Sequence, residues 1–363
     1  MGILRHALCQ PQIVMSKPIV SIIIAFSTIF LCSNMALGKG TSCNILFPIF
    51  SEAEKAGYID CDGKVVVPPT AENAYEFSES IGVIIYSDGA YTVSFNGKKR
   101  FLTKLEMQSG FSEGLAIVKL SDGGYGYVGR NGKVLFRTRA FPVADDEPDL
   151  PTVRPFNNGR ASIKTSKGWI IIDRKFRKVS TKSFADVSDF QGGLATVQTD
   201  EEPSRYGVVN TRGEYVLHPQ FNWPEISDEG LIVVEEKEGE WKIINRDGKV
   251  ITRVQYFSVR GFSDGLAGVT KERKLGSPVG FINSSGKLVL PIKYSTSSKF
   301  SDGLLPVEVD GKIGFISRNG ELTIKPQFKP GMNDFQDGLA YVRDWEYEGY
   351  IDRRGKWIWK RKR

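Results

Sequence analysis

Histidine and the nucleophilic side chains set narrow limits on the chemistry of this 363-residue chain. Its two histidines are His6 and His218, and Pro219 follows His218 directly. A zinc site needs three or four ligands, and a Ser-His-Asp triad needs a histidine held in a cleft, so neither is predicted. No phosphate-binding G-x-x-x-x-G-K-[ST] or nucleophile-elbow G-x-S-x-G sequence occurs in a suitable context. We therefore predict no catalytic, cofactor-binding or metal-binding residue.

Carboxylates are plentiful, and a pair of them suffices for glycoside hydrolysis. A carbohydrate-active, glycosidase-like enzyme of the cell envelope is thus the alternative function, and it requires a pocket with two carboxylates of perturbed pKa. Acidic residues gather in Asp145, Asp146 and Glu147, in Asp200 to Glu202, and between Glu235 and Glu240. None of these runs has the D-x-D-x-D-G spacing of a calcium loop. The simpler interpretation is that they form solvated surface loops.

The elements that position these side chains are organised by one stretch, residues 300 to 328. Asp302-Gly303 marks a turn, and Leu304 to Val309 reads as a half-buried strand. Asp310-Gly311 and Asn319-Gly320 are hairpin turns that enclose a second strand. A third strand begins at Leu322 and is expected to end at Pro326, because proline cannot donate a ladder hydrogen bond. The unit is a three-stranded antiparallel meander.

This unit recurs along the chain. The turn glycines Gly193, Gly230, Gly265, Gly303 and Gly338 lie 35 to 38 residues apart by subtraction, a period typical of repeat proteins. We count about nine units and predict an all-β tandem array of three-stranded meanders. Such units can close into a propeller-like ring or stack into an open superhelix, and the sequence leaves both open.

The repeated pattern G-[YFV]-[IV]-[DN]-x-x-G-[KE], followed later by F-x-[DE]-G-L-A, resembles the WG-repeat (KWG-repeat) proteins of bacteria. Copies include Gly57 to Lys64, Gly280 to Lys287 and Gly349 to Lys356, and the resemblance covers roughly residues 45 to 359. In one copy Phe176 stands where the turn glycine belongs, which puts that hairpin in doubt. The resemblance implies repetitive β structure and a binding role, and it transfers no catalytic residue.

Two columns of apolar residues repeat with the motif, and we predict that they form the core, because a unit of this size cannot bury enough surface alone. The columns are Phe111, Phe190, Phe262, Phe300 and Phe335, and Leu115, Leu194, Leu266, Leu304 and Leu339. The glycines are backbone devices and do not indicate flexibility.

Residues 1 to 38 differ from the rest. Arg5 and Lys17 precede an apolar run from Ile19 to Leu31, and the small-residue sequence Ala36-Leu37-Gly38 follows. This pattern predicts a secretory signal peptide, with a retained anchor as the alternative, and the run is short for a bilayer span. The domains are therefore residues 1–38 as leader, 39–359 as repeat domain and 360–363 as a basic tail. A secreted or periplasmic location follows, without a membrane span after cleavage.

Export bears on the cysteines, because disulfides form in oxidising compartments. Cys43 and Cys61 are the two cysteines beyond the leader. A disulfide between them would pin the start of the repeat array, and two unpaired thiols are the alternative.

Charge argues against nucleic acid as the partner. The formal net charge of +7 falls to +5 without Arg5 and Lys17, and the last four residues supply +4 of that. A repeat body so close to neutral has no basic stripe able to displace counterions.

We hypothesise a non-catalytic exported scaffold that binds a protein or an envelope polymer. Trp223, Trp345 and Tyr347 fall in turns outside the repeat template, where aromatic rings supply contact area. Asp145, Asp146 and Glu147 are further candidate contacts, since repeat insertions often map to a binding face. Each set also has a simpler explanation: the aromatic residues pack locally in their loops, and the acidic residues form a solubilising surface.

Overall fold

The computed structural model describes residues 44–138, 152–201, 203–274, 276–296, 298–331 and 334–363. The chain divides into two compact units, Met1–Ser42 and Cys43–Arg363, and the described residues all belong to the second. They form β-strands and connections, which confirms the all-β prediction. None of them belongs to a helix long and apolar enough to cross a membrane.

The strands of the described residues form nine antiparallel sheets, which we number 1 to 9 in chain order. Sheets 1 to 4 contain β1 (Phe47–Phe50), β2 (Ala56–Ile59) and β3 (Val65–Ala71); β4 (Asn73–Ala74), β5 (Ile81–Tyr86), β6 (Gly89–Ser94) and β7 (Lys99–Thr103); β8 (Glu106–Met107), β9 (Leu115–Lys119), β10 (Tyr125–Gly129) and β11 (Val134–Arg137); and β12 (Arg160–Thr165) and β13 (Gly168–Asp173).

Sheets 5 to 7 contain β14 (Asp186–Val187), β15 (Leu194–Gln198), β16 (Tyr206–Asn210) and β17 (Tyr215–Phe221); β18 (Glu225–Ile226), β19 (Ile232–Lys237), β20 (Glu240–Ile244) and β21 (Val250–Gln255); and β22 (Ser258–Ser263), β23 (Leu266–Thr270), β24 (Val279–Asn283) and β25 (Leu288–Tyr294). Sheets 8 and 9 contain β26 (Leu304–Val309), β27 (Lys312–Ser317) and β28 (Leu322–Phe328); and β29 (Phe335–Gln336), β30 (Leu339–Arg343), β31 (Tyr347–Asp352) and β32 (Trp357–Lys362).

The three-stranded meander predicted from the sequence is present, and most sheets add a short strand before it. In six of the described sheets this strand makes the fourth, and β4, for example, spans only Asn73–Ala74. In sheet 8 a single bridge between Ser295 and Glu308 takes its place. A strand of two residues is too short to show an alternating pattern, so it cannot be recognised from the sequence.

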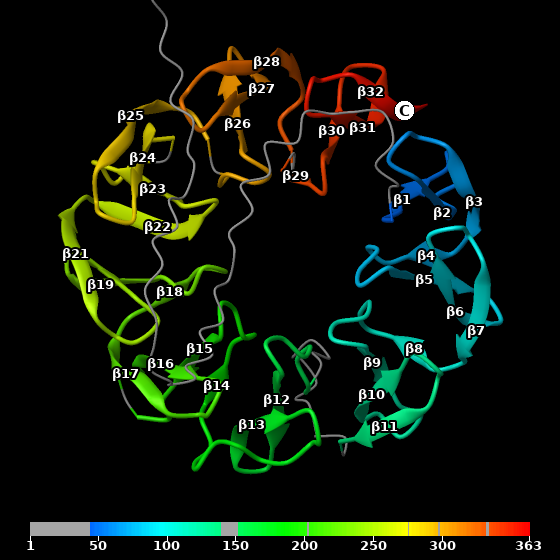
Figure 1. Ribbon diagram of the computed structural model, residues 1–363, viewed down its shortest axis with the longest axis horizontal. Helices are drawn as coiled ribbons and strands as arrows, with labels where there is room; N and C mark the ends of the chain where they lie inside the picture. The colour runs from blue at the N-terminus through cyan, green and yellow to red at the C-terminus, as the bar shows by residue number, and fades with distance from the viewer. Residues whose placement is uncertain (1–43, 139–151, 202, 275, 297, 332–333) are drawn as a thin grey trace, which may run out of the picture. The chain divides into compact units, whose positions relative to one another are not determined.

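The nine sheets stand around a ring with β3, β7, β17 and β25 at the periphery (Figure 1). The last sheet contacts the first: the rings of Phe47 and Tyr350 lie 5.5 Å apart, and the Tyr350 hydroxyl donates a hydrogen bond of 2.9 Å to the Pro48 carbonyl. Arg361 also donates to the Ser51 carbonyl. These contacts close the array, which decides between the two architectures in favour of the propeller-like ring.

The core consists of apolar clusters between successive sheets. All ten residues of the two predicted core columns are buried. The motif phenylalanine packs edge-on against an aromatic ring from the preceding sheet, as Phe300 does with Phe281 at 5.0 Å and Phe335 with Phe315 at 5.0 Å. Each sheet is therefore tied to the next by the residues that define the repeat.

The outermost strands continue beyond the proline that was expected to end them. Pro326 lies inside β28, which runs to Phe328, and the prediction fails because β28 is an edge strand where no donor is required. The ladder is irregular between Ile313 and Phe315, which brings the β28 backbone close to Gly314. A Cβ on Gly314 would lie 2.7 Å from the Ile324 oxygen and 2.8 Å from the Pro326 nitrogen, so the glycine of the repeat is required by this approach.

The hairpin turn at Phe176 forms despite the missing glycine. Phe176 adopts a φ of 60°, and its N–H donates to the Asp173 carbonyl at 2.8 Å. The ring stacks on Phe136 at 5.0 Å. This packing accounts for a bulky residue in a left-handed conformation, which otherwise costs about 1–2 kcal/mol.

The last basic residues belong to the final strand, so the boundary predicted after Trp359 is wrong. β32 extends to Lys362, and Arg361 donates to the buried Glu348 at 2.7 Å. Lys360 lies 3.7 Å from the centre of the Tyr347 ring. These cations therefore hold the last two strands together.

Candidate functional site

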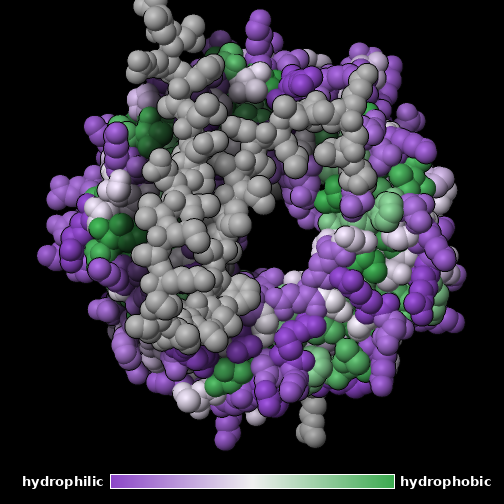
Figure 2. All heavy atoms as spheres, viewed as in Figure 1, coloured by the Kyte–Doolittle hydropathy of each residue, from purple (hydrophilic) through white to green (hydrophobic). Residues whose placement is uncertain are grey.

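The two ends of the ring carry different connections, because successive connections of an antiparallel meander alternate between the ends of the sheet. We count the short inner strand as the first of four, also where it is missing. The turn face then carries the Asp-Gly turns between the first and second strands and the Asn-Gly turns between the third and fourth strands. The loop face carries the connections from second to third strand and from one sheet to the next. In the space-filling view, polar residues dominate the ring and its middle is open (Figure 2).

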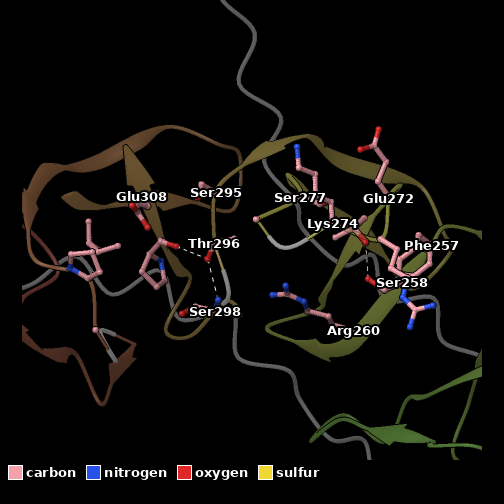
Figure 3. Close-up of a pocket in the computed structure, with 17 residues that line it drawn as sticks. Phe257, Ser258, Arg260, Glu272, Lys274, Ser277, Ser295, Thr296, Ser298 and Glu308 are labelled. Atoms are coloured by element: carbon pink, nitrogen blue, oxygen red, sulfur yellow. Dashed lines mark hydrogen bonds between the residues drawn. The ribbon is translucent and has the colours of Figure 1, made fainter. Parts of the chain in front are cut away.

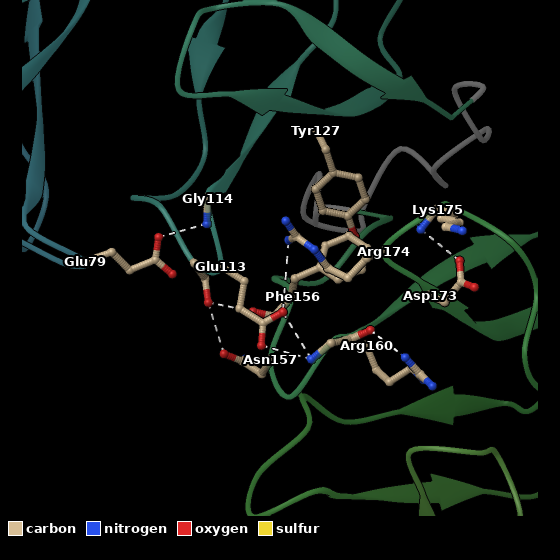
Figure 4. A network of polar contacts seen from close by, with 12 residues as sticks. Glu79, Glu113, Gly114, Tyr127, Phe156, Asn157, Arg160, Asp173, Arg174 and Lys175 are labelled. Carbon is tan, nitrogen blue, oxygen red and sulfur yellow. Dashed lines mark hydrogen bonds and ion pairs between the residues drawn. The ribbon is translucent and has the colours of Figure 1, made fainter.

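On the turn face, the residue before the motif glycine position joins six of the nine sheets to the sheet that follows. Five of the six residues have positive φ, for example 52° at Glu79 and 51° at Asp302, and the side-chain oxygens of all six accept the N–H of the motif glycine in the following sheet. The bonds link Glu79 with Gly114 (2.8 Å), Glu113 with Gly159 (2.9 Å), Asn158 with Gly193 (3.0 Å), Glu229 with Gly265 (3.1 Å), Asp264 with Gly303 (2.6 Å) and Asp302 with Gly338 (2.7 Å). Figure 4 shows Glu79 and Glu113 in this role. We call this set the inter-sheet clamp.

Motif serines reinforce the clamp. The Ser112 hydroxyl donates to the Phe156 carbonyl at 2.6 Å, and the Ser263 hydroxyl donates to the Phe300 carbonyl at 2.7 Å. Arg130 adds an ion pair of 2.6 Å to Glu79, which helps to keep the pKa of that carboxyl below its usual value against the opposing effect of burial. These polar residues of the motif thus hold neighbouring sheets together.

The clamp ends at Asp337, whose carboxylate has no hydrogen bond or ion pair with the described residues. It lies with Glu76 and Asp334 on a pocket of about 260 Å³ between sheets 9 and 1. Desolvation raises the pKa of both Asp334 and Asp337, and the charges of Asp302 and Glu76 raise that of Asp337 further. We call this the seam pocket.

The loop face carries a groove between sheets 5 and 6 that contains one of the predicted contact residues. Trp223 is 63% exposed, lies 4.8 Å from the Tyr206 ring centre to centre, and lines a groove of about 390 Å³. Asp186 and Asp189 lie in the same groove. Desolvation of the Asp189 carboxyl raises its pKa, an effect that the Arg154 cation opposes and the Asp186 charge reinforces. We call this the Trp223 groove.

A second groove lies between sheets 7 and 8 and measures about 570 Å³ (Figure 3). Arg260 extends into it from β22, and Arg273 and Lys274 come from the long β23–β24 loop. Its other lining is rich in hydroxyl groups, among them Ser277 and Ser295. We call this the Arg260 groove.

The remaining predicted contacts are divided. Trp345 is 76% exposed in the β30–β31 turn on the loop face, and the Lys329 ammonium lies 4.3 Å from its ring centre. Tyr347 begins β31 and is half-buried. Asp145, Asp146 and Glu147 lie outside the described residues.

The predicted histidine and cysteines are placed as follows. His218 is exposed on the outer strand β17 beside the Tyr215 ring, 4.9 Å away centre to centre. Cys61 is disulfide-bonded; Cys43 lies outside the described residues, so the pairing of the two stays a prediction. The described part of the chain brings no three histidine, cysteine or acidic residues together as a metal site.

Sequence reasoning missed Asp186, Asp189 and Arg260. Asp186 and Asp189 lie in or beside the two-residue strand β14, which is too short to show a pattern, and Arg260 lies in the first strand of sheet 7, β22. Their position could have been found by counting back from the motif phenylalanine, since Arg260 precedes Phe262 by two residues and Asp186 precedes Phe190 by four. That they line grooves between sheets follows only from the closed ring.

Comparisons with known proteins agree with the repeat and the fold. The profile of a WG containing repeat matches residues 57–89, 206–241, 243–274, 280–312 and 313–344. A comparison with curated proteins found no match.

Among solved structures, one described as the crystal structure of the eukaryotic initiation factor covers 88% of this chain and 95% of its own, at 10% identity and a TM-score of 0.61. The computationally designed protein Ika8 covers 77% of this chain and 92% of its own, at 14% identity and a TM-score of 0.43. BamB from Moraxella catarrhalis covers 66% and 80%, at 13% identity and a TM-score of 0.32. At these identities the first likeness concerns the fold alone, and the other two carry no weight here.

Proposed function

Since the chain belongs to the WG-repeat proteins, a family of repetitive β structure, we propose that it is a non-catalytic binding protein that holds a partner on its loop face. The partner is a protein or a polymer of the cell envelope. Export to the cell surface or periplasm is part of the proposal, and it is supported by Arg5, Lys17 and the apolar run of residues 19–31.

The observation that carries the proposal is the exposure of two tryptophans on one face. Trp223 and Trp345 are 63% and 76% exposed, and neither belongs to the apolar clusters between the sheets. Large aromatic rings left in solvent at loop positions are typical of binding surfaces, where their burial supplies much of the affinity. Clamp bonds join sheets 6 to 7, 7 to 8 and 8 to 9, the sheets that lie between the two rings.

The grooves beside these rings favour binding over an extended face. The Trp223 groove and the Arg260 groove are separated by sheets 6 and 7, and both are lined by connections of the loop face. One is lined by Asp186, Asp189 and Glu225, the other by Arg260, Arg273 and Lys274. A partner that spans sheets 6 and 7 therefore meets these carboxylates at one end and these cations at the other, which gives it a defined orientation.

The test compares retention of envelope components by three purified proteins: the unaltered protein, Trp223→Ala and Phe95→Ala. Phe95 is the matched control, because it is 49% exposed but lies in the β6–β7 turn on the turn face. An envelope extract and a panel of washed peptidoglycan and polysaccharides are passed over each protein. We expect a component that the unaltered protein and Phe95→Ala retain and Trp223→Ala loses. Equal retention by all three would contradict the use of the loop face.

A second function, glycoside hydrolysis, is favoured by one observation. Asp186 and Asp189 share the Trp223 groove, and the raised pKa of Asp189 is the property of a general acid. The same panel separates the two functions, since an enzyme would release shortened glycans on long incubation. Release that Asp189→Asn abolishes would establish the enzyme; retention of a polymer of unchanged mass would support binding.

A further inference from the structure

The Arg260 groove contains polar atoms that the described protein leaves unsatisfied. Nη1 of Arg260 and Oγ of Ser277 are buried and have no hydrogen-bond partner among the described residues. Arg260 also forms no ion pair with the described residues, although Glu272 and Glu308 line other parts of the groove. Figure 3 shows its guanidinium reaching from sheet 7 into the space toward sheet 8. Buried polar atoms of this kind usually bind a ligand, an ion or water.

The repeat itself shows what an arginine at this position binds. Arg154 and Arg260 each precede the motif phenylalanine by two residues, so they are equivalent residues of sheets 4 and 7. Nη2 of Arg154 donates to both carboxylate oxygens of Asp186 in the next sheet, at 2.9 and 3.3 Å. An arginine at this position is therefore neutralised by a carboxylate from the following sheet.

Sheet 8, which follows the sheet of Arg260, has no carboxylate at the position equivalent to Asp186. Asp186 pairs with Gln198, which lies five residues after its motif glycine. The residue five after Gly303 is Glu308, and it pairs with Ser295. A serine thus occupies the place of the aspartate, and a shorter, uncharged side chain leaves the guanidinium facing the groove.

We propose that the Arg260 groove binds an acidic side chain or the C-terminal carboxylate of a partner polypeptide, which takes the place that Asp186 fills beside Arg154. The proposal rests on the proposed binding function and names the chemical class of the partner at one groove. The planar guanidinium suits a carboxylate, with which it forms paired, charge-assisted hydrogen bonds. A volume of about 570 Å³ also admits the residues next to it.

A polypeptide fits the rest of the lining better than a uniform polyanion. Glu272 and Glu308 line the groove together with the cations, and they would repel a chain that carries a negative charge on every unit. The neutral amides of a peptide avoid this repulsion. Hydroxyls such as those of Ser277 and Ser298 can donate to and accept from its backbone.

The experiment selects peptides from a phage-displayed library of random dodecapeptides on the full, folded protein, and then measures the binding of synthetic copies. Three variants are compared with the unaltered protein: Arg260→Gln, the control Arg100→Gln, and Ser295→Asp. Arg100 is exposed on the outer strand β7, away from the groove. Thermal unfolding checks that all four proteins are folded.

Ser295→Asp is the sharper variant, because it leaves Arg260 in place. The new carboxylate stands where Asp186 stands in sheet 5, so it should pair with Arg260 and occupy the site from within. We expect selected peptides to share one acidic residue and to bind Arg100→Gln as they bind the unaltered protein. Both Arg260→Gln and Ser295→Asp should weaken binding by about tenfold or more, the loss expected for one charge-assisted contact.

Two results would overturn the inference and leave the binding function standing. One is a set of selected peptides without an acidic residue, or whose binding survives both groove variants. The other is binding of inorganic phosphate or of an acidic polysaccharide, in place of peptides, that Arg260→Gln abolishes. The failure of the binding function itself is seen separately, as equal retention by Trp223→Ala and the unaltered protein.

Discussion

The inter-sheet clamp can be tested by a comparison that the chain itself supplies. Asp302 and Asp337 occupy the same motif position in sheets 8 and 9, with φ of 51° and 52°. Asp302 accepts the Gly338 N–H at 2.7 Å, whereas Asp337 has no such bond among the described residues. Asp302→Ala and Asp337→Ala therefore remove the same atoms from the same backbone geometry and differ in the bond lost.

The structure sets the size of the difference. A hydrogen bond to a charged group contributes about 1.5–3 kcal/mol, and alanine in the left-handed region costs about 1–2 kcal/mol in either variant. Asp302→Ala should thus lower the free energy of unfolding by up to about 2.5 to 5 kcal/mol. Asp337→Ala should lower it by less than about 1 kcal/mol, because removing a desolvated carboxylate offsets the backbone cost. Removing Asp302 also relieves its repulsion of the Asp337 carboxylate, so the sum of the bond and backbone terms is an upper bound on the cost.

Equilibrium urea unfolding, followed by tryptophan fluorescence, measures both values under the same conditions. Amide hydrogen exchange at Gly338 adds a local readout, since its N–H should exchange faster in Asp302→Ala alone. Equal losses of stability in the two variants, with an unchanged Gly338 amide, would refute the role assigned to the clamp.

Three further perturbations test the fold. Gly314→Ala places a Cβ 2.7 Å from the Ile324 oxygen and should cost about 1–3 kcal/mol in urea unfolding; wild-type stability would show that the close approach of β28 is wrong. Phe300→Ala removes a fully buried ring and should cost about 3–5 kcal/mol, and an unshifted thermal midpoint would disprove its core position. The pKa of Asp337 is raised in the folded protein, so the folded state favours the neutral carboxyl over the charged carboxylate. The contribution of this preference to stability is present below the unfolded pKa and is lost as pH rises through the folded pKa. Asp337→Asn should therefore be more stable than the unaltered protein at neutral pH. The two proteins should be equally stable near pH 3, about one unit below the pKa of an unperturbed Asp. Unfolding curves that coincide at both pH values would count against a desolvated carboxylate at Asp337.

Much of the fold is readable from the sequence because local rules set it. Asn319-Gly320 and its relatives specify hairpins, and the spacing of the turn glycines specifies the repeat. Ring closure is not readable in this way, because it depends on contacts such as that of Tyr350 with Pro48, which are 302 residues apart in the chain. The continuation of β28 through Pro326 was misjudged for a related reason: proline is excluded from inner strands, and nothing local marks a strand as an edge.

The candidate site was readable only in part. Trp223 and Trp345 stood out because they interrupt the repeat, and both prove to be exposed. Arg260 was hidden because its meaning depends on Ser295, which lies in the next sheet and differs from its counterpart Asp186. A missing carboxylate becomes visible only when equivalent positions of successive sheets are compared in three dimensions.

Hydroxyl-radical footprinting of the protein with and without envelope extract shows whether the loop face is the binding surface. Oxidation of Trp223 and Trp345 is compared with that of Phe95, which is exposed on the turn face. We expect the extract to protect both tryptophans from oxidation and to leave Phe95 as reactive as before. Protection of Phe95 with unchanged oxidation of both tryptophans would place the partner on the opposite face and contradict the account.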